Sequence, residues 1–391
     1  MRERLQTGEC AAGSRRKGLG LLIGREGHKM SAFSRRDLAR AASGFVLAGI
    51  VATSASEADG ADKAAAPAKA IDPLSLVDPE LLPIARRMQE TSAQMPLSDA
   101  FISRVRKEGS HAPLARPGLS KVPFEERRLP VPGGSADVRV FVVNARAGAI
   151  RPGILHTHGG GYILGSIDEA LPDLLELSAT LDCVVVTVDY RLAPETRFSG
   201  SIEDNYAALL WMYRNASALG VDRRRIALLG ESAGGGHAAL LAIAARDRRE
   251  VPVAFQALIY PMLDDRTGSS RPVPPHIGTL GWTAESNRYG WRSFLGQEPG
   301  GHKVPARAVP ARLADLSGLP PAYIAVGALD LFVEEDIQYA SRLLNAGVPV
   351  ELQIVPGAFH GFDGIGRDTA IAQRFTASKI GALRRATGSA A

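Results

Sequence analysis

A serine enclosed by small residues, Gly230-Glu231-Ser232-Ala233-Gly234, has the residue types and spacing of a hydrolase nucleophile. An apolar run of strand length, 226–229, precedes it, and a helical pattern begins at Ala233. A nucleophile on such a sharp strand-to-helix turn needs small residues two places to either side, because the neighbouring backbones approach closely there. The start of the helix also points its amides at the site and favours negative charge. The pattern predicts that Ser232 is a nucleophile.

A second glycine-rich segment, His158-Gly159-Gly160-Gly161, follows another strand-like run. Glycines leave backbone N–H groups unobstructed, so we expect the amides of Gly159 and Gly160 to form an oxyanion hole with that of Ala233. One such donor is typically worth about 3–4 kcal/mol of transition-state stabilisation. A phosphate-binding loop is not supported, because the sequence has neither a Gly-Lys-Ser/Thr nor a G-x-G-x-x-G pattern.

Several histidines compete for the role of base. A serine hydroxyl needs a base, and the base needs an orienting carboxylate. His360 follows the last strand-like run, where this chemistry requires the base. We expect His158 to brace its own loop. A metal pair of His156 and His158 has no apparent third ligand, and His302 lies in an irregular stretch.

The orienting acid is predicted to be Asp330, which ends the apolar run 323–329. In a sheet of this kind the order along the chain is serine, acid and histidine, each just after a later strand. Glu334, Glu335 and Asp336 are rival acids. They fall at the start of the next helical pattern, where acidic residues usually serve as helix N-terminal charge.

These residues must be positioned by alternating strands and helices. Apolar runs predict strands at 139–143, 153–158, 184–190, 226–230, 255–260, 322–326 and 350–355. Helical patterns cover 168–181, 202–218, 233–245, 334–345 and 368–385. Near-continuous apolar strands that alternate with helices indicate an α/β fold with a mainly parallel sheet covered on both faces.

Two further segments are expected to form a small helical cap. Helical spacing at 81–88 and 98–107 predicts short helices outside the sheet. The stretch 264–313 is rich in Pro, Gly and Ser and carries Trp282, Trp291 and Phe294, and such long insertions usually serve as lids or binding segments. We therefore assign 72–391 to a hydrolase domain whose cap comprises about 72–120 and 265–312.

The N-terminal segment has the features of an export signal. Arg35-Arg36 is followed by the charge-free, Ala-rich stretch 41–55 and then by small residues. This order is typical of a twin-arginine signal, and the apolar run is short for a transmembrane helix. We assign 1–58 to this leader and 59–71 to a linker, and we expect a periplasmic protein without stable membrane insertion. A cytoplasmic protein with a basic tail is the alternative.

Charge and cysteine usage exclude other classes of protein. Residues 1–40 hold ten Lys or Arg against four acidic residues, so the chain's formal charge of +5 comes from the leader. The nearly neutral remainder gives no basis for nucleic-acid binding. The two cysteines, Cys10 and Cys183, differ in context and match no zinc spacing, so we expect no metal and no disulfide.

Taken together, the motifs resemble the hormone-sensitive-lipase-like family of bacterial esterases. The resemblance rests on His158-Gly159-Gly160-Gly161-Tyr162, Asp189-Tyr190-Arg191-Leu192-Ala193-Pro194-Glu195, Gly230-Glu231-Ser232-Ala233-Gly234-Gly235, Asp330, and His360-Gly361-Phe362. It implies an α/β-hydrolase core with a helical cap that hydrolyses short- to medium-chain acyl esters without a cofactor. It also implies that 190–195 braces the loops. Leu331 and Glu334 depart from the family pattern, which usually has Pro and Asp at these places.

The expected reaction is two-step acyl transfer through an acyl-enzyme on Ser232. The expected substrate pocket comprises Tyr162, Leu331, Phe332 and Phe362. An amidase or formamidase would use the same triad. A ligand-binding protein that kept the fold without turnover is the alternative from another class. The presence of all three triad residues and the glycines favours an enzyme.

Overall fold

The computed structural model describes residues 71–92, 97–109, 121–131, 133 and 136–388. Eight strands form one sheet in the order β1-β2-β4-β3-β5-β6-β7-β8. The pairs β1–β2 and β2–β4 are antiparallel, and the remaining neighbours run parallel. The strands are β1 (Phe124–Leu129), β2 (Val138–Val143), β3 (Arg151–Thr157), β4 (Val184–Asp189), β5 (Val221–Glu231), β6 (Phe255–Ile259), β7 (Ala322–Gly327) and β8 (Val350–Val355).

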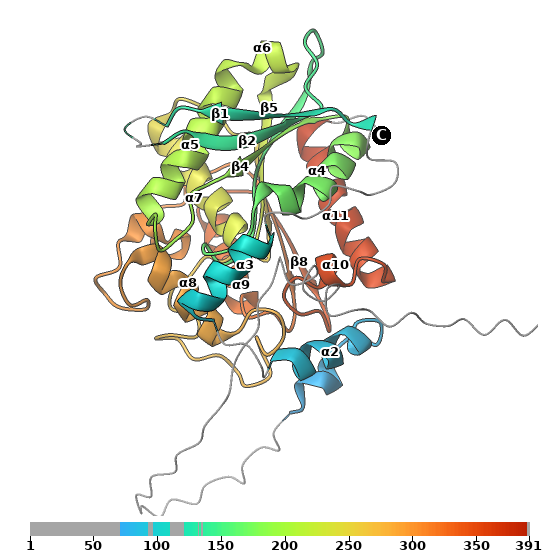
Figure 1. Cartoon of the computed structure of the whole chain (residues 1–391), viewed down its shortest axis with the longest axis vertical. Helices are drawn as coiled ribbons and strands as arrows, with labels where there is room; N and C mark the ends of the chain where they lie inside the picture. The colour runs from blue at the N-terminus through green and yellow to red at the C-terminus, as the bar shows by residue number, and fades with distance from the viewer. Residues whose placement is uncertain (1–70, 93–96, 110–120, 132, 134–135, 389–391) are drawn as a thin grey trace, which may run out of the picture.

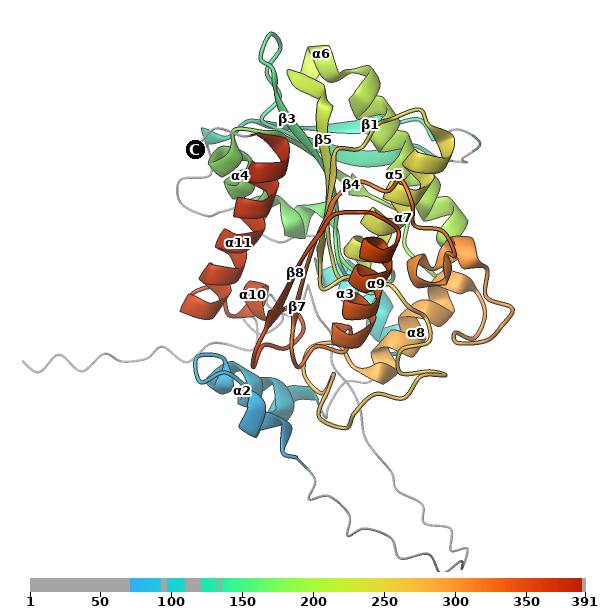
Figure 2. The same ribbon diagram turned by 180° about the vertical axis from the view of Figure 1, so that it is seen from behind.

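Helices cover both faces of this sheet (Figures 1 and 2). One face packs on α5 (Phe198–Arg214), α6 (Ala216–Leu219), α7 (Ala233–Arg248) and α9 (Val333–Asn345). The other packs on α2 (Leu82–Ser92), α4 (Ile167–Leu181), α10 (Phe362–Ile365) and α11 (Ala370–Thr387). Strands β3, β4, β6 and β7 are almost wholly buried, which explains their continuous apolar sequence. The predicted α/β fold with a mainly parallel sheet is confirmed.

All seven predicted strands are present, and β1 is an additional strand that apolar periodicity does not predict. Its sequence, Phe-Glu-Glu-Arg-Arg-Leu, is charged, and all but its last residue are exposed. β1 lies at the edge of the sheet, where charged side chains are common because they discourage pairing with another chain. Apolar periodicity therefore could not reveal it. The helix predicted over 202–218 is also divided, because α5 ends at Arg214 and α6 follows.

The insertion expected to be irregular contains a regular helix, α8 (Ala284–Leu295). The Thr283 side chain caps its start by accepting from the Ser286 amide, and Gly296 ends it in the left-handed conformation at φ 68°. α8 packs with α3 (Asp99–Gly109) in a third apolar cluster that contains Phe101, Trp291 and Phe294. Both ribbon views show α3 and α8 side by side.

The two N-terminal helices have different neighbours. α3 joins the aromatic cluster of α8. In contrast, Ala85 and Met88 of α2, together with Leu81 just before it, pack into the cluster that contains α4 and α11. The proposed export signal at 1–58 lies outside the described residues. Among the helices that the structure does describe, none is both long and apolar enough to cross a membrane.

Candidate active site

Ser232 occupies the turn between β5 and α7. Its backbone dihedrals, φ 57° and ψ −122°, lie in a region that non-glycine residues seldom adopt. Two hydrogen bonds hold it there: the Ser232 amide donates to the Ile259 carbonyl at 2.9 Å, and the Met262 amide donates to the Ser232 carbonyl at 2.9 Å. Backbone strain of this kind persists where the surroundings enforce it, and it is common at functional sites.

The glycines around Ser232 allow three backbones to meet. A Cβ at Gly234 would lie 2.0 Å from the Thr157 carbonyl oxygen, and one at Gly230 would lie 2.2 Å from the Gly234 carbonyl oxygen. The Thr157 hydroxyl donates to that Gly234 carbonyl at 2.7 Å, which ties the end of β3 to the turn. The two glycines of the Gly-x-Ser-x-Gly motif are therefore required here, because a side chain at either position would collide with neighbouring backbone atoms.

His360 bridges Ser232 and Asp330. Its Nδ1 lies 2.7 Å from Asp330 Oδ2, and its Nε2 lies 2.9 Å from Ser232 Oγ. A carboxylate accepts from Nδ1–H, so Nε2 is left to accept from the serine hydroxyl. The other Asp330 oxygen accepts from the Phe332 amide at 2.9 Å. All three side chains are buried, at 1% exposure or less. This is the geometry of a serine activated by an oriented imidazole.

The rival acids and bases lie elsewhere. Glu334 is exposed and accepts from Gln338, which fits helix N-terminal charge. Glu335 instead accepts from the backbone amides of Leu263 and Asp264 at 2.6 and 3.0 Å. Asp336 is fully buried, and burial raises the pKa of its carboxyl well above the usual value. His302 is exposed.

The glycine loop after β3 lies against the serine turn. A Cβ at Gly159 would lie 3.5 Å from Ser232 Cβ and 3.1 Å from the Glu231 carbonyl oxygen. Gly160 has φ 118°, and a Cβ there would lie 2.1 Å from the Leu164 carbonyl oxygen. Only glycine fits this conformation and this contact. The loop thus brings backbone of Gly159 and Gly160 beside Ser232, where an oxyanion hole is expected.

His158 braces the loop as expected. Its ring stacks on Tyr190 at 4.3 Å, and its Nδ1 lies 2.8 Å from the Gly159 carbonyl, which it reaches as a donor. Burial lowers the pKa of His158 to about 4, so the ring is neutral at pH 7. His156 is engaged by Thr187 and Glu231, each at 2.8 Å. Across the described residues, no cluster of three His, Cys, Asp or Glu could hold a metal.

Arg106 of α3 is a bracing residue that the sequence analysis missed. Its guanidinium donates to the Ile163 carbonyl at 2.9 Å and to the Ala193 carbonyl at 2.5 Å, and it pairs with Glu195 at 2.9 Å. It therefore fastens the glycine loop to the segment 190–195. The partners are separated from Arg106 by 57 to 89 positions, so helical periodicity alone could not identify them.

Three of the four residues predicted for the pocket share one apolar cluster. Tyr162, Leu331 and Phe332 belong to the aromatic cluster of α8, and the Phe332 ring meets the His360 ring edge-on at 5.2 Å. The Tyr162 hydroxyl donates to the Met262 carbonyl at 3.0 Å, and its ring stacks on Phe294. Phe362 lies in the opposite cluster, against Phe375.

Residues 264–313, here called the covering segment, pass close to the triad. A Cβ at Gly281 would lie 2.5 Å from the His360 carbonyl oxygen. A Cβ at Gly161 would lie 2.1 Å from Trp282 Cη2, so the indole packs directly on the glycine loop. The Trp282 Nε1–H donates to Asn287, and Asn287 donates to the Thr267 carbonyl. Trp282 is thus fixed beside both the glycine loop and the His360 loop.

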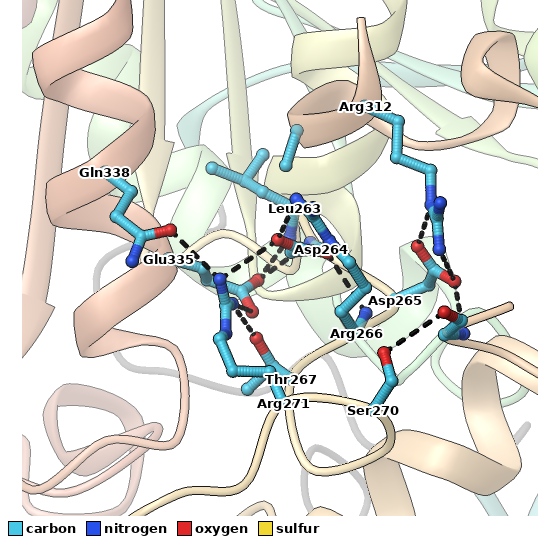
Figure 3. Close-up of polar contacts among 12 residues, drawn as sticks. Leu263, Asp264, Asp265, Arg266, Thr267, Ser270, Arg271, Arg312, Glu335 and Gln338 are labelled. Carbon is cyan, nitrogen blue, oxygen red and sulfur yellow. Dashed lines mark hydrogen bonds and ion pairs between the residues drawn. The ribbon is translucent and has the colours of Figure 1, made fainter. Parts of the chain in front are cut away.

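A group of ion pairs joins the two ends of the covering segment, and Arg271 connects it to Glu335 of α9 at 3.7 Å (Figure 3). Arg312 holds Asp265 through contacts of 2.5 and 2.9 Å, and Asp265 also accepts from the Gly300 amide. Arg266 and Arg271 both reach Asp264, at 2.7 and 3.2 Å. These arginines hold the pKa of the Asp264 carboxyl below its usual value despite its burial, which acts to raise it.

Comparisons with known proteins agree with this architecture. Residues 154–364 match a family model described as the alpha/beta hydrolase fold. Esterase LipI of Mycobacterium tuberculosis is 37% identical over 60% of this chain and 72% of its own length. Carboxylesterase NlhH of the same species is 36% identical over 60% and 74%.

A solved structure is also similar. A bacterial heroin esterase has 35% sequence identity and a TM-score of 0.73, covering 80% of this chain and 99% of its own. The family model spans more than half of the chain and contains the glycine loop, the serine turn and both remaining triad positions. The chain therefore belongs to the α/β-hydrolase-fold family, and within it to the hormone-sensitive-lipase-like branch that its motifs predict.

Proposed function

We propose that this protein is a serine carboxylic-ester hydrolase that acts on short- to medium-chain acyl esters. The observation that carries the proposal is the pair of hydrogen bonds at His360, which donates to Asp330 and accepts from the Ser232 hydroxyl. Its relatives, which are named as esterases, support the ester as the substrate class.

In the proposed mechanism, His360 takes the proton of the Ser232 hydroxyl as the oxygen attacks the ester carbonyl. The amides of Gly159, Gly160 and Ala233 stabilise the negative oxygen of the tetrahedral intermediate. The intermediate collapses, and the alcohol leaves with the proton from His360. Water then attacks the acyl-enzyme with His360 as base, and the acid and free Ser232 are released. Asp330 keeps the imidazole in the required tautomer and stabilises its charged form.

The test is hydrolysis of p-nitrophenyl esters from acetate to palmitate by the full chain and by Ser232→Ala. We expect the highest kcat/KM on short and medium chains and its loss in the variant. Ser293→Ala is the matched control, because Ser293 lies on α8 and its hydroxyl donates to the Tyr289 carbonyl. A folded wild-type protein that hydrolyses anilides but none of these esters would favour an amidase, and one that hydrolyses neither would favour a binding protein.

We also propose that 1–58 directs twin-arginine export to the periplasm. The paired Arg35 and Arg36, followed by a charge-free stretch, support it. In cells, Arg35→Lys/Arg36→Lys is expected to keep the protein in the cytoplasm, whereas the wild type is recovered from the periplasm with a shortened N-terminus. Equal distribution of the two proteins would contradict the proposal.

A further inference from the structure

A group of charged side chains connects the turn of Ser232 to the loop of His360. Glu231 directly precedes Ser232, and its carboxylate lies 2.8 Å from His156 and 3.8 Å from the ammonium of Lys379 on α11. Asp363 follows His360 by three residues and accepts from the Tyr260 hydroxyl at 2.8 Å. The Tyr260 ring meets the His360 ring at 4.9 Å. We call Glu231, Lys379 and Asp363 the Lys379 cluster. Only the Tyr260 ring separates Asp363 from the base, His360.

Lys379 is the cation shared by the two carboxylates of this cluster. Its side chain is only 15% exposed, and that of Glu231 is 22% exposed. Burial acts to lower the pKa of Lys379, but Glu231 and Asp363 attract its ammonium and raise the pKa above its usual value. Conversely, burial acts to raise the pKa of Glu231, but His156 and Lys379 hold it below its usual value. Burial raises the pKa of Asp363, and Lys379 and Tyr260 counteract this rise.

Other charged groups near the cluster are paired among themselves. Asp173 of α4 attracts Lys379 but forms an ion pair with Arg367 at 2.5 Å, and Glu176 also attracts Arg367. On the side of His360, the facing groups are Asp330, Ser232, Tyr260 and the ring of Phe332. The charge of Asp330 in turn acts on the buried Asp336 of α9. Loss of Lys379 would therefore leave Glu231 and Asp363 without their shared counter-charge.

We propose that Lys379 is a positioning residue for the reaction. Its ammonium offsets the charge of Glu231, which precedes Ser232, and that of Asp363, which follows His360 by three residues, and it thereby sets how readily His360 accepts a proton. The reason is electrostatic: two partly buried carboxylates near an imidazole favour its charged form unless a cation offsets them. Since His360 must be neutral to act as base, Lys379 extends the working range of the enzyme toward lower pH.

The proposal predicts opposite effects for two substitutions. Lys379→Met leaves negative charge unbalanced, so the acid limb of the kcat/KM profile moves to higher pH. Asp363→Asn removes negative charge, so the limb moves to lower pH. The expected shifts are about half a unit to one unit each, as for one nearby charge at an effective dielectric constant of about 20. A purely structural role would not produce shifts of opposite sign.

One control keeps the positive charge at position 379, and the other removes a positive charge from an exposed position. Lys379→Arg retains the cation, and Arg374→Met removes a cation from an exposed site on the same helix, where the side chain is 67% exposed. Both are expected to keep the acid limb within about 0.2 units of wild type. Glu231→Gln is predicted to shift the limb in the same direction as Asp363→Asn, and it decides the question if Lys379→Met does not fold.

The experiment measures the acid limb with p-nitrophenyl acetate and, in parallel, titrates the His360 imidazole by NMR. The first readout rests on the proposed ester hydrolysis, and the second does not. An inactive wild type would overturn the proposed function alone, and the NMR titration would still test Lys379. Shifts of opposite sign for Lys379→Met and Asp363→Asn support the role of Lys379. The role is overturned if Lys379→Met and Asp363→Asn shift the limb in the same direction. It is also overturned if neither of them shifts the limb, or if Glu231→Gln does not.

Discussion

At the ends of β5, β7 and β8, the side chains of Ser232, Asp330 and His360 form hydrogen bonds with one another and with a backbone amide, all of 2.9 Å or less. The covering segment next to them is built differently. Its inner side is aromatic, with Trp282, Trp291 and Phe294 packed on the glycine loop and α3, and the ion pair Arg312–Asp265 joins its two ends.

This difference separates two kinds of sensitivity. Hydrogen-bond geometry in the triad fixes whether a proton can move, so a small change there is expected to abolish the chemistry. The aromatic packing of the covering segment fixes the space beside the nucleophile, so a change there is expected to alter which acyl groups fit.

The largest effect is expected for Asp330→Asn. The amide would favour the wrong tautomer of His360 and would lower kcat by about 10⁴-fold. Glu334→Gln, at an exposed position four residues on, is the matched control and should remain within twofold of wild type. Comparable losses in the two variants, measured on p-nitrophenyl butyrate, would show that Asp330 has no special role.

A smaller but still large loss is expected for Gly160→Ala. The added methyl group collides with the Leu164 carbonyl, and φ 118° disfavours any side chain. If the shifted loop loses an oxyanion donor, kcat falls by about 10²- to 10³-fold. Gly301→Ala is the control, because a Cβ at Gly301 has no neighbour within 4 Å. A Gly160→Ala variant with full activity would remove the loop from the mechanism.

A change in the covering segment is expected to alter selectivity. Trp282→Leu removes aromatic volume beside the glycine loop, so the ratio of kcat/KM for p-nitrophenyl decanoate to that for the acetate should rise about tenfold. Trp211→Leu, on α5 and packed against the apolar cluster of α5, α7 and α9, should leave this ratio unchanged. An equal loss on both esters in Trp282→Leu would indicate that the indole only stabilises the fold.

The smallest effect at neutral pH is expected for His237→Leu. His237 of α7 lies among the rings of Tyr162, Tyr190 and Phe294. Among the described residues, its ring nitrogens have no hydrogen-bond partner. Burial lowers the pKa of His237 to about 3, so the unfolded chain binds a proton below pH 6.5 that the folded chain does not. The free energy of unfolding therefore falls as pH falls, by about 1.4 kcal/mol per pH unit from this group.

His237→Leu removes this dependence. At pH 4 the variant should gain about 3 kcal/mol relative to wild type, beyond any difference at pH 7. Urea unfolding at the two pH values measures the gain. A constant difference between the two proteins would mean that His237 is protonated in the folded state as readily as in the unfolded state.

The sequence predicted the strand ends better than their surroundings. Ser232, Asp330 and His360 could be placed because each follows a buried apolar strand, and the chemistry requires that order. The helix α8 was missed because its apolar residues interrupt a stretch rich in Gly and Pro, although Thr283 and Gly296 mark its two ends.

Contacts between distant segments could not be predicted from periodicity. Arg106, Glu335 and Lys379 look like surface charges in the sequence. In the structure, Arg106 holds two loops, Glu335 accepts hydrogen bonds from the Leu263 and Asp264 amides, and Lys379 balances two carboxylates. Such roles depend on which helix faces which loop. A single sequence does not contain that information in any local pattern.

The most direct test of the account is labelling by a fluorophosphonate, followed by mass spectrometry of the peptides. An activated serine is phosphonylated, whereas an ordinary serine hydroxyl is not. The account predicts one adduct, on Ser232, which disappears in His360→Gln and persists in His302→Gln. A folded, unlabelled wild-type protein, or a label on another serine, would contradict the claim that Ser232 is the nucleophile.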